Sequence, residues 1–298
     1  MIQLADDSTK LAVREMWKIC FNDSDAFMDI YFNSKYRNKN TLVYIDDNKP
    51  VASLQVLIYN FTFHGVEIPI AYLSGLCTLP EYRKMGYMGK LITKSYDISL
   101  EREIPLMLLV PQDDYVINYY EKFGFIQTFD EDTEILPELQ ELIVSSSGDI
   151  QKAYKTFDSL FRKNEMTVQK SFDDFETILD DAKLFNYPPK NRLKGMARII
   201  DVKKLVSIYA RRYPNNRFIL KVNDSLIPEN NRLFSISQGK AEIMSPESIF
   251  ESTFESDILN IDINELAQML LGYHTSEKTK PFSDLFPETK PAMHFMLE

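Results

Sequence analysis

LCTLPEYRKMGYMGKL, residues 76–91, reads as a strand, a short basic turn with two glycines, and the start of a helix. The first N–H groups of a helix have no partner inside the helix, and the helix dipole favours an anion at that end. A strand that leads into such a turn therefore directs free backbone N–H groups at one place, which suits a phosphate group. The stretch predicts a phosphate-binding turn without naming the phosphate.

Two common phosphate-binding motifs do not fit this turn. A P-loop needs Gly-x-x-x-x-Gly-Lys followed by Ser or Thr, but Gly86 and Gly89 are too close together and Leu91 stands in the Ser/Thr position. A dinucleotide-binding turn needs three glycines spaced Gly-x-Gly-x-x-Gly. The pattern that remains is Arg-x-x-Gly-x-x-Gly, directly after a strand and Pro80.

The periodicity around the turn indicates an α+β domain. Before it, the sequence predicts helices at 8–21 and 25–32 and then a meander of strands at 41–45, 51–59, 61–63, 66–68 and 71–79. His64-Gly65 is expected to form a hairpin-like break within this meander. After the basic turn, we expect a helix at 88–102 and a fully apolar strand at 105–110. A helix at 114–123, ended by Gly124, and a strand at 125–135 follow. The strand–helix–strand part requires a parallel pair with a right-handed crossover.

The rest of the chain divides into two further segments. Amphipathic helices are predicted at 149–163 and 172–185, and a region of mixed strands and helices begins at Gly195. We therefore expect three units: residues 1–136, a helical connecting segment at 137–190, and a carboxy-terminal domain at 191–298.

Composition excludes several classes of protein. The net charge of −10 and the lack of a basic stripe argue against a nucleic-acid partner, while they are compatible with a cationic substrate. No apolar run approaches the ~18 residues of a membrane span, and the amino terminus does not read as a signal peptide. Cys20 and Cys77 have no metal-ligand spacing, so we expect buried free thiols and no metal. These features predict a cytoplasmic protein.

The Arg-x-x-Gly-x-x-Gly turn after a meander resembles the acyl-CoA pyrophosphate loop of the GNAT superfamily of N-acetyltransferases. Met88 departs from the strict family form, which has Gly or Ala at that place. The resemblance implies acetyl-CoA as co-substrate and a mixed, mostly antiparallel sheet flanked by helices. An ordinary turn with a solvated basic face remains the alternative. The residues that the resemblance assigns to acetyl-CoA are Leu76, Thr78, Arg83, Lys84, Met85, Gly86, Tyr87, Met88 and Gly89.

The segment Tyr119-Tyr120-Glu121-Lys122-Phe123-Gly124-Phe125 has the Tyr-x-x-x-Gly-Phe ending of the corresponding family helix. In the family this tyrosine lies near the thioester sulfur, which implies Tyr120 as the acid that protonates the departing thiolate. A phenol with a pKa near ~10 is neutral at pH 7 and can serve in this way. The alternative is that Tyr120 only anchors the helix.

The carboxy-terminal part of the sequence resembles one branch of this superfamily in particular. Gly195–Val202, Asn264–Tyr273 and Leu285-Phe286-Pro287 are similar to the sterol-carrier-like domain of enhanced-intracellular-survival (Eis) type acetyltransferases. Those relatives usually carry a second acetyltransferase-like domain in the middle, and here it is reduced to about 50 residues. This branch also tolerates bulky residues at the position of Met88.

The resemblance implies direct attack of a primary amine, on a small molecule or a lysine-like peptide group, on the thioester. In the family the carboxy-terminal carboxylate takes the proton, which assigns that role to Glu298; Glu67 and Glu81 are weaker candidates. A non-catalytic acyl-CoA or lipid-binding sensor is the alternative function. The acyl chain length and the formation of a homo-oligomer stay open.

Overall fold

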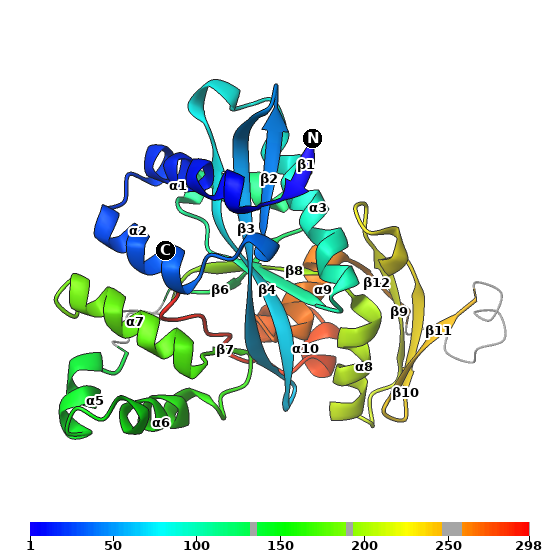
Figure 1. Cartoon of the computed structure of the whole chain (residues 1–298). Helices are drawn as coiled ribbons and strands as arrows, with labels where there is room; N and C mark the ends of the chain where they lie inside the picture. The colour runs from blue at the N-terminus through cyan, green and yellow to red at the C-terminus, as the bar shows by residue number, and fades with distance from the viewer. Residues whose placement is uncertain (132–135, 189–192, 246–257, 298) are drawn as a thin grey trace.

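A computed structural model describes residues 1–131, 136–188, 193–245 and 258–297 (Figure 1). In these ranges the amino-terminal part is built on an eight-stranded sheet of order β1-β2-β3-β4-β5-β8-β6, with β7 paired to β3. All its pairs are antiparallel except β4–β5. Its strands are β1 (Ile2–Leu4), β2 (Thr41–Asp46), β3 (Lys49–Phe63), β4 (Val66–Thr78), β5 (Leu106–Leu109), β6 (Ile126–Phe129), β7 (Thr167–Gln169) and β8 (Gly195–Ile199).

Helices cover both faces of this sheet. Alternate residues of β3 face opposite cores: Leu57 and Tyr59 pack with the helices before the sheet, while Leu54 and Val56 pack under the helix that follows the basic turn. The helices are α1 (Asp7–Phe21) and α2 (Asp25–Ser34) on the first face, α3 (Tyr87–Glu101) on the second, and the short α4 (Ile117–Glu121) before β6. The α+β architecture and its mostly antiparallel sheet are as predicted.

The antiparallel meander is longer than its sequence pattern indicated. The expected break at His64-Gly65 is the hairpin turn between β3 and β4, where both residues have positive φ. From β4 the chain crosses over through α3 to the parallel strand β5, as expected. The last expected strand is shorter than predicted: β6 ends at Phe129, and residues 132–135 lie outside the described part.

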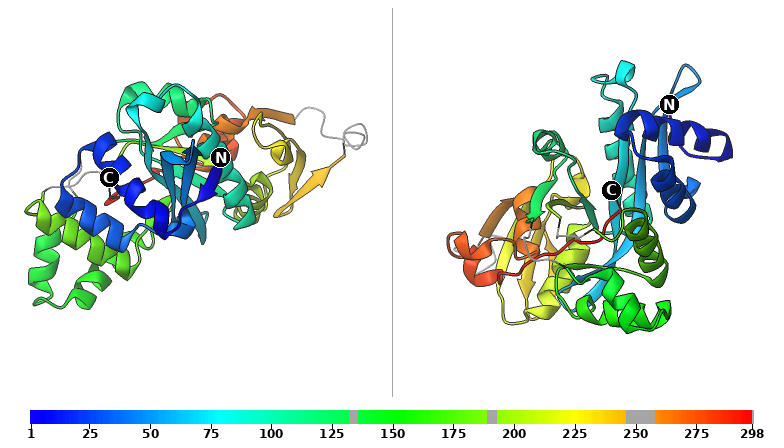
Figure 2. Two further views of the ribbon diagram at one scale, coloured as in Figure 1. Left: turned by 45° about the horizontal axis from the view of Figure 1, so that its top comes forward. Right: turned by 90° about the vertical axis from the view of Figure 1, so that its left-hand side faces the viewer.

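The middle segment forms α5 (Leu139–Ser145), α6 (Ile150–Phe161) and α7 (Phe172–Leu184) around a small apolar core that contains Phe157 and Phe175. Figure 2 shows these helices as a layer on the side of the molecule away from the second sheet. The segment is helical as predicted, with one addition. Strand β7 lies between α6 and α7 and extends the first sheet along β3.

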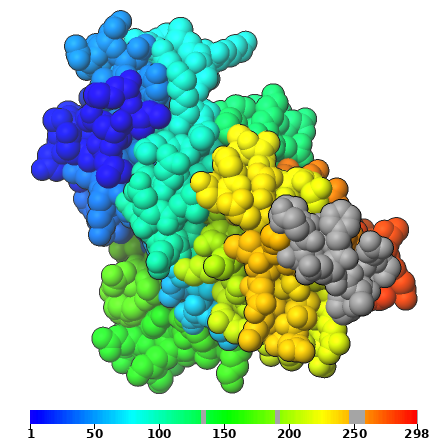
Figure 3. All heavy atoms as spheres, turned by 90° about the vertical axis from the view of Figure 1, so that its right-hand side faces the viewer, coloured from blue at the N-terminus to red at the C-terminus, as the bar shows by residue number. Residues whose placement is uncertain are grey.

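The carboxy-terminal part has a second, four-stranded sheet of order β11-β10-β9-β12 among the described residues. Its elements are α8 (Val202–Arg212), β9 (Phe218–Asn223), β10 (Leu233–Ser237), β11 (Lys240–Met244), β12 (Ile258–Asp262), α9 (Ile263–Leu270) and α10 (Phe282–Leu285). Short 3-10 helices lie at η1 (Asn38–Asn40), η2 (Pro80–Tyr82), η3 (Asp114–Val116), η4 (Pro228–Asn230) and η7 (Thr275–Glu277). Figure 3 shows this sheet beside the amino-terminal domain; Leu226 and Ile227, in the loop after β9, pack with Ile98 of α3.

Strand β8 is placed differently from the expectation. The sequence pattern assigned it to the carboxy-terminal domain, but it lies in the first sheet between β5 and β6. The side chain of Arg198 on β8 is fully buried and pairs with Asp224, in the loop after β9. The two sheets are thus joined through a shared interior. The proposed domain boundary at residue 191 remains a prediction.

None of the helices in the described ranges has the length and apolar character needed to cross a membrane.

Candidate active site

A cavity of about 590 Å³ opens where β4 and β5 separate. The two strands pair only from Ile70–Leu106 to Tyr72–Leu108, after which β4 continues to Thr78 and β5 ends at Leu109. The cavity is lined by residues of α1 and the loop after it, β4, the loop after β5, and Tyr120 of α4. A gap between these two strands is therefore present. We call it the acyl cavity.

A β-bulge in β4 shapes one wall of the acyl cavity. Ser53 pairs with Cys77 and Gln55 with Ser74, so that two β4 residues, Gly75 and Leu76, oppose one residue of β3. A bulge takes backbone groups out of the regular ladder, so an N–H near Leu76 is suitably placed for the carbonyl oxygen of an acyl group. Gly75 has φ +58°, and a Cβ there would lie 2.3 Å from Trp17, which fixes this position as glycine.

The basic turn has the geometry of an anion site. Helix α3 begins after Gly86, whose φ is +78°, and the first bond into the helix is from Lys90 N–H to the Gly86 carbonyl, at 3.2 Å. The N–H groups of Tyr87, Met88 and Gly89 therefore make no backbone hydrogen bond within the described residues. Arg83 and Lys84 are exposed beside them, and Arg83 Nε donates to the Thr78 carbonyl, 3.2 Å away. These groups form a positive, donor-rich surface that suits a pyrophosphate.

Two contacts fix where this turn lies. The Tyr87 ring stacks on Tyr44 with centroids 4.1 Å apart, and its hydroxyl donates to Asp46, which raises the pKa of Tyr87 to about 12. Gly89 touches α4: a Cβ there would lie 2.9 Å from the ring of Phe123. The second glycine of the motif is thus required by close packing, while Gly86 is required by its backbone conformation.

Tyr120 lines the acyl cavity and is half-buried. Burial, together with the neighbouring Tyr119 and Tyr115, holds its pKa well above the ordinary range of a phenol. The hydroxyl is therefore protonated at neutral pH and can donate. Tyr119 instead packs on Phe123 with ring centroids 5.2 Å apart, as an anchor of the helix.

The lining of the acyl cavity is predominantly acidic. Four carboxylates and one lysine lie on its lining: Asp23, Asp113, Asp114, Glu131 and Lys194. Lys194 pairs with Asp114 at 2.7 Å, and Asp23 accepts a 2.7 Å hydrogen bond from Trp17 Nε1. The sequence analysis missed Asp23 and Trp17, because only the packing of α1 on β4 brings them to the cavity. No local motif marks them.

The three candidates for the catalytic base, Glu298, Glu67 and Glu81, lie in different parts of the chain. Glu298 lies outside the described residues. The preceding tail is buried: Met293 O accepts from Leu193 N–H at 2.8 Å, and Leu297 belongs to the same apolar cluster as Tyr72 of the acyl cavity. Glu67 lies near the hairpin tip and pairs with Arg162, and Glu81 is exposed beside Lys49. Neither of these two lines the acyl cavity.

Within the described part of the chain, no group of three or more His, Cys, Asp or Glu side chains could hold a metal ion. Cys20 is half-buried, Cys77 is buried, and both are free thiols.

Two family models match the sequence. Residues 2–127 match the acetyltransferase (GNAT) domain, and residues 202–291 match the sterol carrier protein domain. No curated protein matches the chain.

Several solved structures share the fold over nearly the whole chain. A probable N-acyltransferase from Enterococcus faecalis has a TM-score of 0.70 and 14% identity, covering 93% of this chain and 91% of that one. A GCN5-related N-acetyltransferase from Anabaena variabilis has a TM-score of 0.68 and 14% identity, covering 98% of both chains. Eis1 from Mycobacterium abscessus has a TM-score of 0.59 and 12% identity, covering 91% of this chain and 90% of that one.

A GNAT acetyltransferase domain implies acetyl transfer from an acyl-CoA. The chain is therefore an acyltransferase enzyme that joins a GNAT acetyltransferase domain to a sterol carrier protein domain.

Proposed function

We propose that this enzyme transfers the acetyl group of acetyl-CoA to a primary amine of a cationic small molecule or of a lysine-like peptide group. One observation carries the proposal: the lining of the acyl cavity, which includes Gly75 and Leu76 of the β4 bulge, contains four carboxylates against one lysine. An acidic lining favours a protonated amine and raises its local concentration. Asp23 is the half-buried carboxylate of this group, and it suits an ammonium ion.

In the proposed reaction the amine first loses a proton to a carboxylate, for which the terminal residue Glu298 is our candidate. The amine nitrogen then attacks the thioester carbon. The oxyanion accepts a hydrogen bond from a backbone N–H near Leu76, which favours the tetrahedral intermediate. The C–S bond breaks, and Tyr120 gives its proton to the departing thiolate. The nitrogen loses its second proton to solvent, from which the Tyr120 phenolate takes a proton back, so that an amide, a free thiol and the starting tyrosine remain. The N–H groups of residues 84–89, with Arg83 and Lys84, hold the pyrophosphate, and Thr78 borders the pantetheine.

The first test is binding and turnover with the full-length protein. Calorimetry with acetyl-CoA should give saturable binding, and a panel of polyamines, aminoglycosides and lysine peptides should contain an amine that is acetylated. Product and CoA should be measured by chromatography with mass detection, because the free thiols would react with a thiol reagent. Absence of acetyl-CoA binding at millimolar ligand would refute the proposal.

A second test separates the enzyme from an acyl-CoA sensor. Deleting residues 297–298 removes the proposed base, so acetyl-CoA binding should persist while turnover falls at least ~100-fold. Unchanged turnover would remove the tail from the mechanism. Binding by the intact protein without turnover of any amine would favour the sensor.

A further inference from the structure

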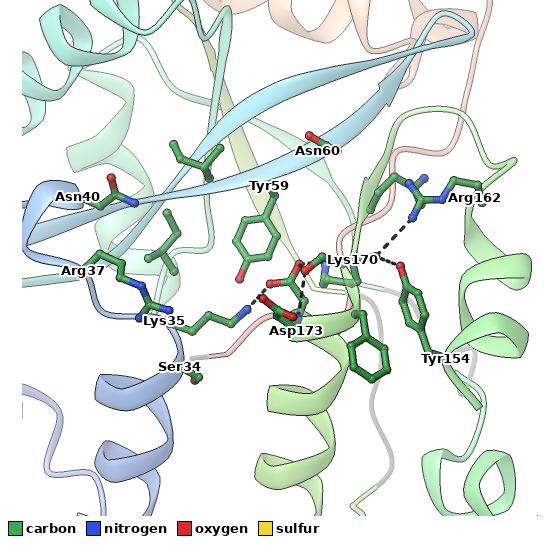
Figure 4. A pocket seen from close by; sticks show the side chains of 16 residues that line it. Ser34, Lys35, Arg37, Asn40, Tyr59, Asn60, Tyr154, Arg162, Lys170 and Asp173 are labelled. Atoms are coloured by element: carbon green, nitrogen blue, oxygen red, sulfur yellow. Dashed lines mark hydrogen bonds and ion pairs between the residues drawn. The ribbon is translucent and has the colours of Figure 1, made fainter. Parts of the chain in front are cut away.

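A second cavity, of about 550 Å³, opens on the edge of β3 between α2 and α7 (Figure 4). Strand β2 pairs with β3 as far as Gln55, and β7 pairs with it from Asn60 onwards. Between these points no described strand covers that edge. This cavity, called the edge cavity below, shares no lining residue with the acyl cavity.

The edge cavity is positively charged in a protein that is strongly acidic overall. Its lining contains four cations, Lys35, Arg37, Arg162 and Lys170, against two carboxylates, Asp173 and Asp174. Some of these charges are already neutralised by neighbours: Lys35 pairs with Asp174, and Arg162 pairs with Asp158 and Glu67.

Two of the cations have no such partner. Arg37 donates only to the backbone carbonyls of Asn33 and Tyr36, and it forms no ion pair with a described carboxylate. Lys170 is 4% exposed, and its ammonium contacts the Met296 thioether at 3.2 Å and lies 5.2 Å from the centre of the Tyr59 ring. A thioether is a weak hydrogen-bond acceptor and carries no charge. The ammonium of Lys170 is therefore buried without a carboxylate partner among the described residues.

Both cationic and acidic side chains surround Lys170. The groups that face it are Lys35 of α2, Tyr59 of β3, Tyr154 of α6, Arg162 after α6, Asp173 and Asp174 of α7, and Met296 of the tail. Burial lowers the pKa of Lys170 to about 7, with Lys35 adding to the effect and Asp174 opposing it. An anion bound beside this amine would restore its charged form.

The walls of the edge cavity indicate what kind of anion fits. Figure 4 shows Lys35, Tyr59, Lys170 and Asp173 meeting at its centre, with Arg37 and Asn40 on one side and Tyr154 and Arg162 on the other. Tyr59, Tyr154 and Phe172 supply aromatic surface for an organic body. Asp173 and Asp174 in the first turn of α7 repel a dianion such as phosphate. A volume of this size accommodates a small molecule.

We propose that the edge cavity binds a small organic carboxylate, whose carboxylate group pairs with Lys170 and whose body packs against the aromatic wall of Tyr59, Tyr154 and Phe172. The site lies apart from acetyl transfer, because it shares no lining residue with the acyl cavity, although the two cavities lie on the paired strands β3 and β4, where the rings of Tyr59 and Tyr72 have centroids 6.1 Å apart. The binding therefore needs neither acetyl-CoA nor turnover.

The test compares benzoate, its neutral isostere benzamide, and inorganic phosphate, each titrated into the full-length protein without acetyl-CoA. We expect benzoate to bind with a Kd on the order of millimolar, about tenfold or more tighter than either of the other two. Calorimetry in two buffers of different ionisation enthalpy should show proton uptake of about half a proton at pH 7, because the free amine has a pKa of about 7. Equal binding of benzamide, or tighter binding of phosphate, would overturn the assignment.

Matched variants locate the site. Lys170→Met should weaken benzoate at least tenfold and abolish the proton uptake, whereas Lys163→Met removes an exposed charge nearby, outside the lining, and should change the affinity less than twofold. Arg37→Gln, at an exposed residue, provides a variant without a change in the core and should weaken benzoate about threefold. Unchanged affinity in Lys170→Met, or in Arg37→Gln where Lys170→Met does not fold, refutes the proposal.

Discussion

Gly75 is the residue on which the shape of the acyl cavity depends most directly. Replacing it by alanine places a Cβ 2.3 Å from Trp17 at a residue with φ +58°. The positive φ costs about 1 kcal/mol and the overpacking about 1–3 kcal/mol more, so the free energy of unfolding should fall by about 2–4 kcal/mol. Urea unfolding measures this, with Gly148→Ala as the control: its φ is +81° but nothing lies within 4 Å, so only the first cost applies. Equal losses in both variants would contradict the packing argument.

Tyr120 offers a sharper test of chemistry at the same scale. In Tyr120→Phe the ring stays and the proton donor is lost, so kcat should fall about 100-fold while KM for acetyl-CoA stays within about twofold. Tyr119→Phe is the matched control, since Tyr119 packs on Phe123 and does not line the acyl cavity; its kcat should change less than about twofold. Steady-state kinetics with the best amine substrate measures both constants. If Tyr120→Phe has the kcat of the wild type, Tyr120 serves only to anchor the helix.

Residues were predictable where their role depends on a local pattern. The turn from Arg83 to Gly89 can be recognised in the sequence because all the residues of its motif lie within one strand–turn–helix unit. Trp17 and Asp23 could not be found in this way, because they reach the acyl cavity only through the packing of α1 against β4, more than 50 residues along the chain. Gly75 was missed for the same reason, since its contact partner is Trp17.

The start of helix α3 lies in close contact with Phe123, in the turn after α4. In Gly89→Ala the new Cβ would lie 2.9 Å from the far end of the Phe123 ring, which pushes the start of α3 away from its place. We expect acetyl-CoA affinity to fall about 5–10-fold, because the free N–H groups move with the helix. Calorimetry measures the loss. Phe123→Leu in the Gly89→Ala background shortens the opposing side chain and should recover most of the affinity; no recovery would show that the loss arises elsewhere.

Elements were predicted better than their pairing. From α1 to β6 the order of helices and strands follows from periodicity, and so does the helical middle segment, whereas the three-residue strand β1 was not predicted. Strand β8 was recognised as a strand, but its insertion between β5 and β6 depends on contacts with residues about 70–90 positions away. The three residues of β7 are too few to show the alternation of a strand, so the sequence pattern does not predict this strand. The residues form a strand because they pair with β3.

At the scale of the whole molecule, the buried pair of Arg198 and Asp224 joins the first sheet to the second. Arg198 donates to both carboxylate oxygens of Asp224, at 2.7 and 2.8 Å, and Asp224 also accepts from Asn230 and from the backbone N–H groups of Leu226 and Ile227. Arg198→Met leaves this carboxylate buried without its cation, so the free energy of unfolding should fall by about 3–5 kcal/mol.

Chemical denaturation of Arg198→Met measures this loss against Lys183→Met, which breaks an exposed pair with Asp180 and should cost less than about 1 kcal/mol. A similar, small loss in both variants would show that the two parts of the molecule are held together by apolar packing alone.

His274 makes a second link between the two parts, and this one depends on pH. It contacts Asp130, after β6, at 2.7 Å and Glu277 at 3.1 Å, and hydrogen bonds from the ring to both carboxylates raise the pKa of His274 above 6.5. A raised folded-state pKa means that the stabilisation is complete below pH 6.5 and is lost as the pH rises through the folded value. The stability that the wild type has over His274→Gln, measured as the difference between their urea midpoints, should therefore be largest at about pH 5.5 and shrink towards about pH 8.5. Lys170 and His64, whose folded-state pKa values are lowered by burial, titrate alike in both proteins and cancel in this difference. In the control His64→Gln the difference from the wild type should change in the opposite sense, because burial lowers the pKa of His64 to about 4, so that this histidine costs stability as the pH falls below about 6.5. A midpoint difference for His274→Gln that does not change with pH would place the titrating group elsewhere.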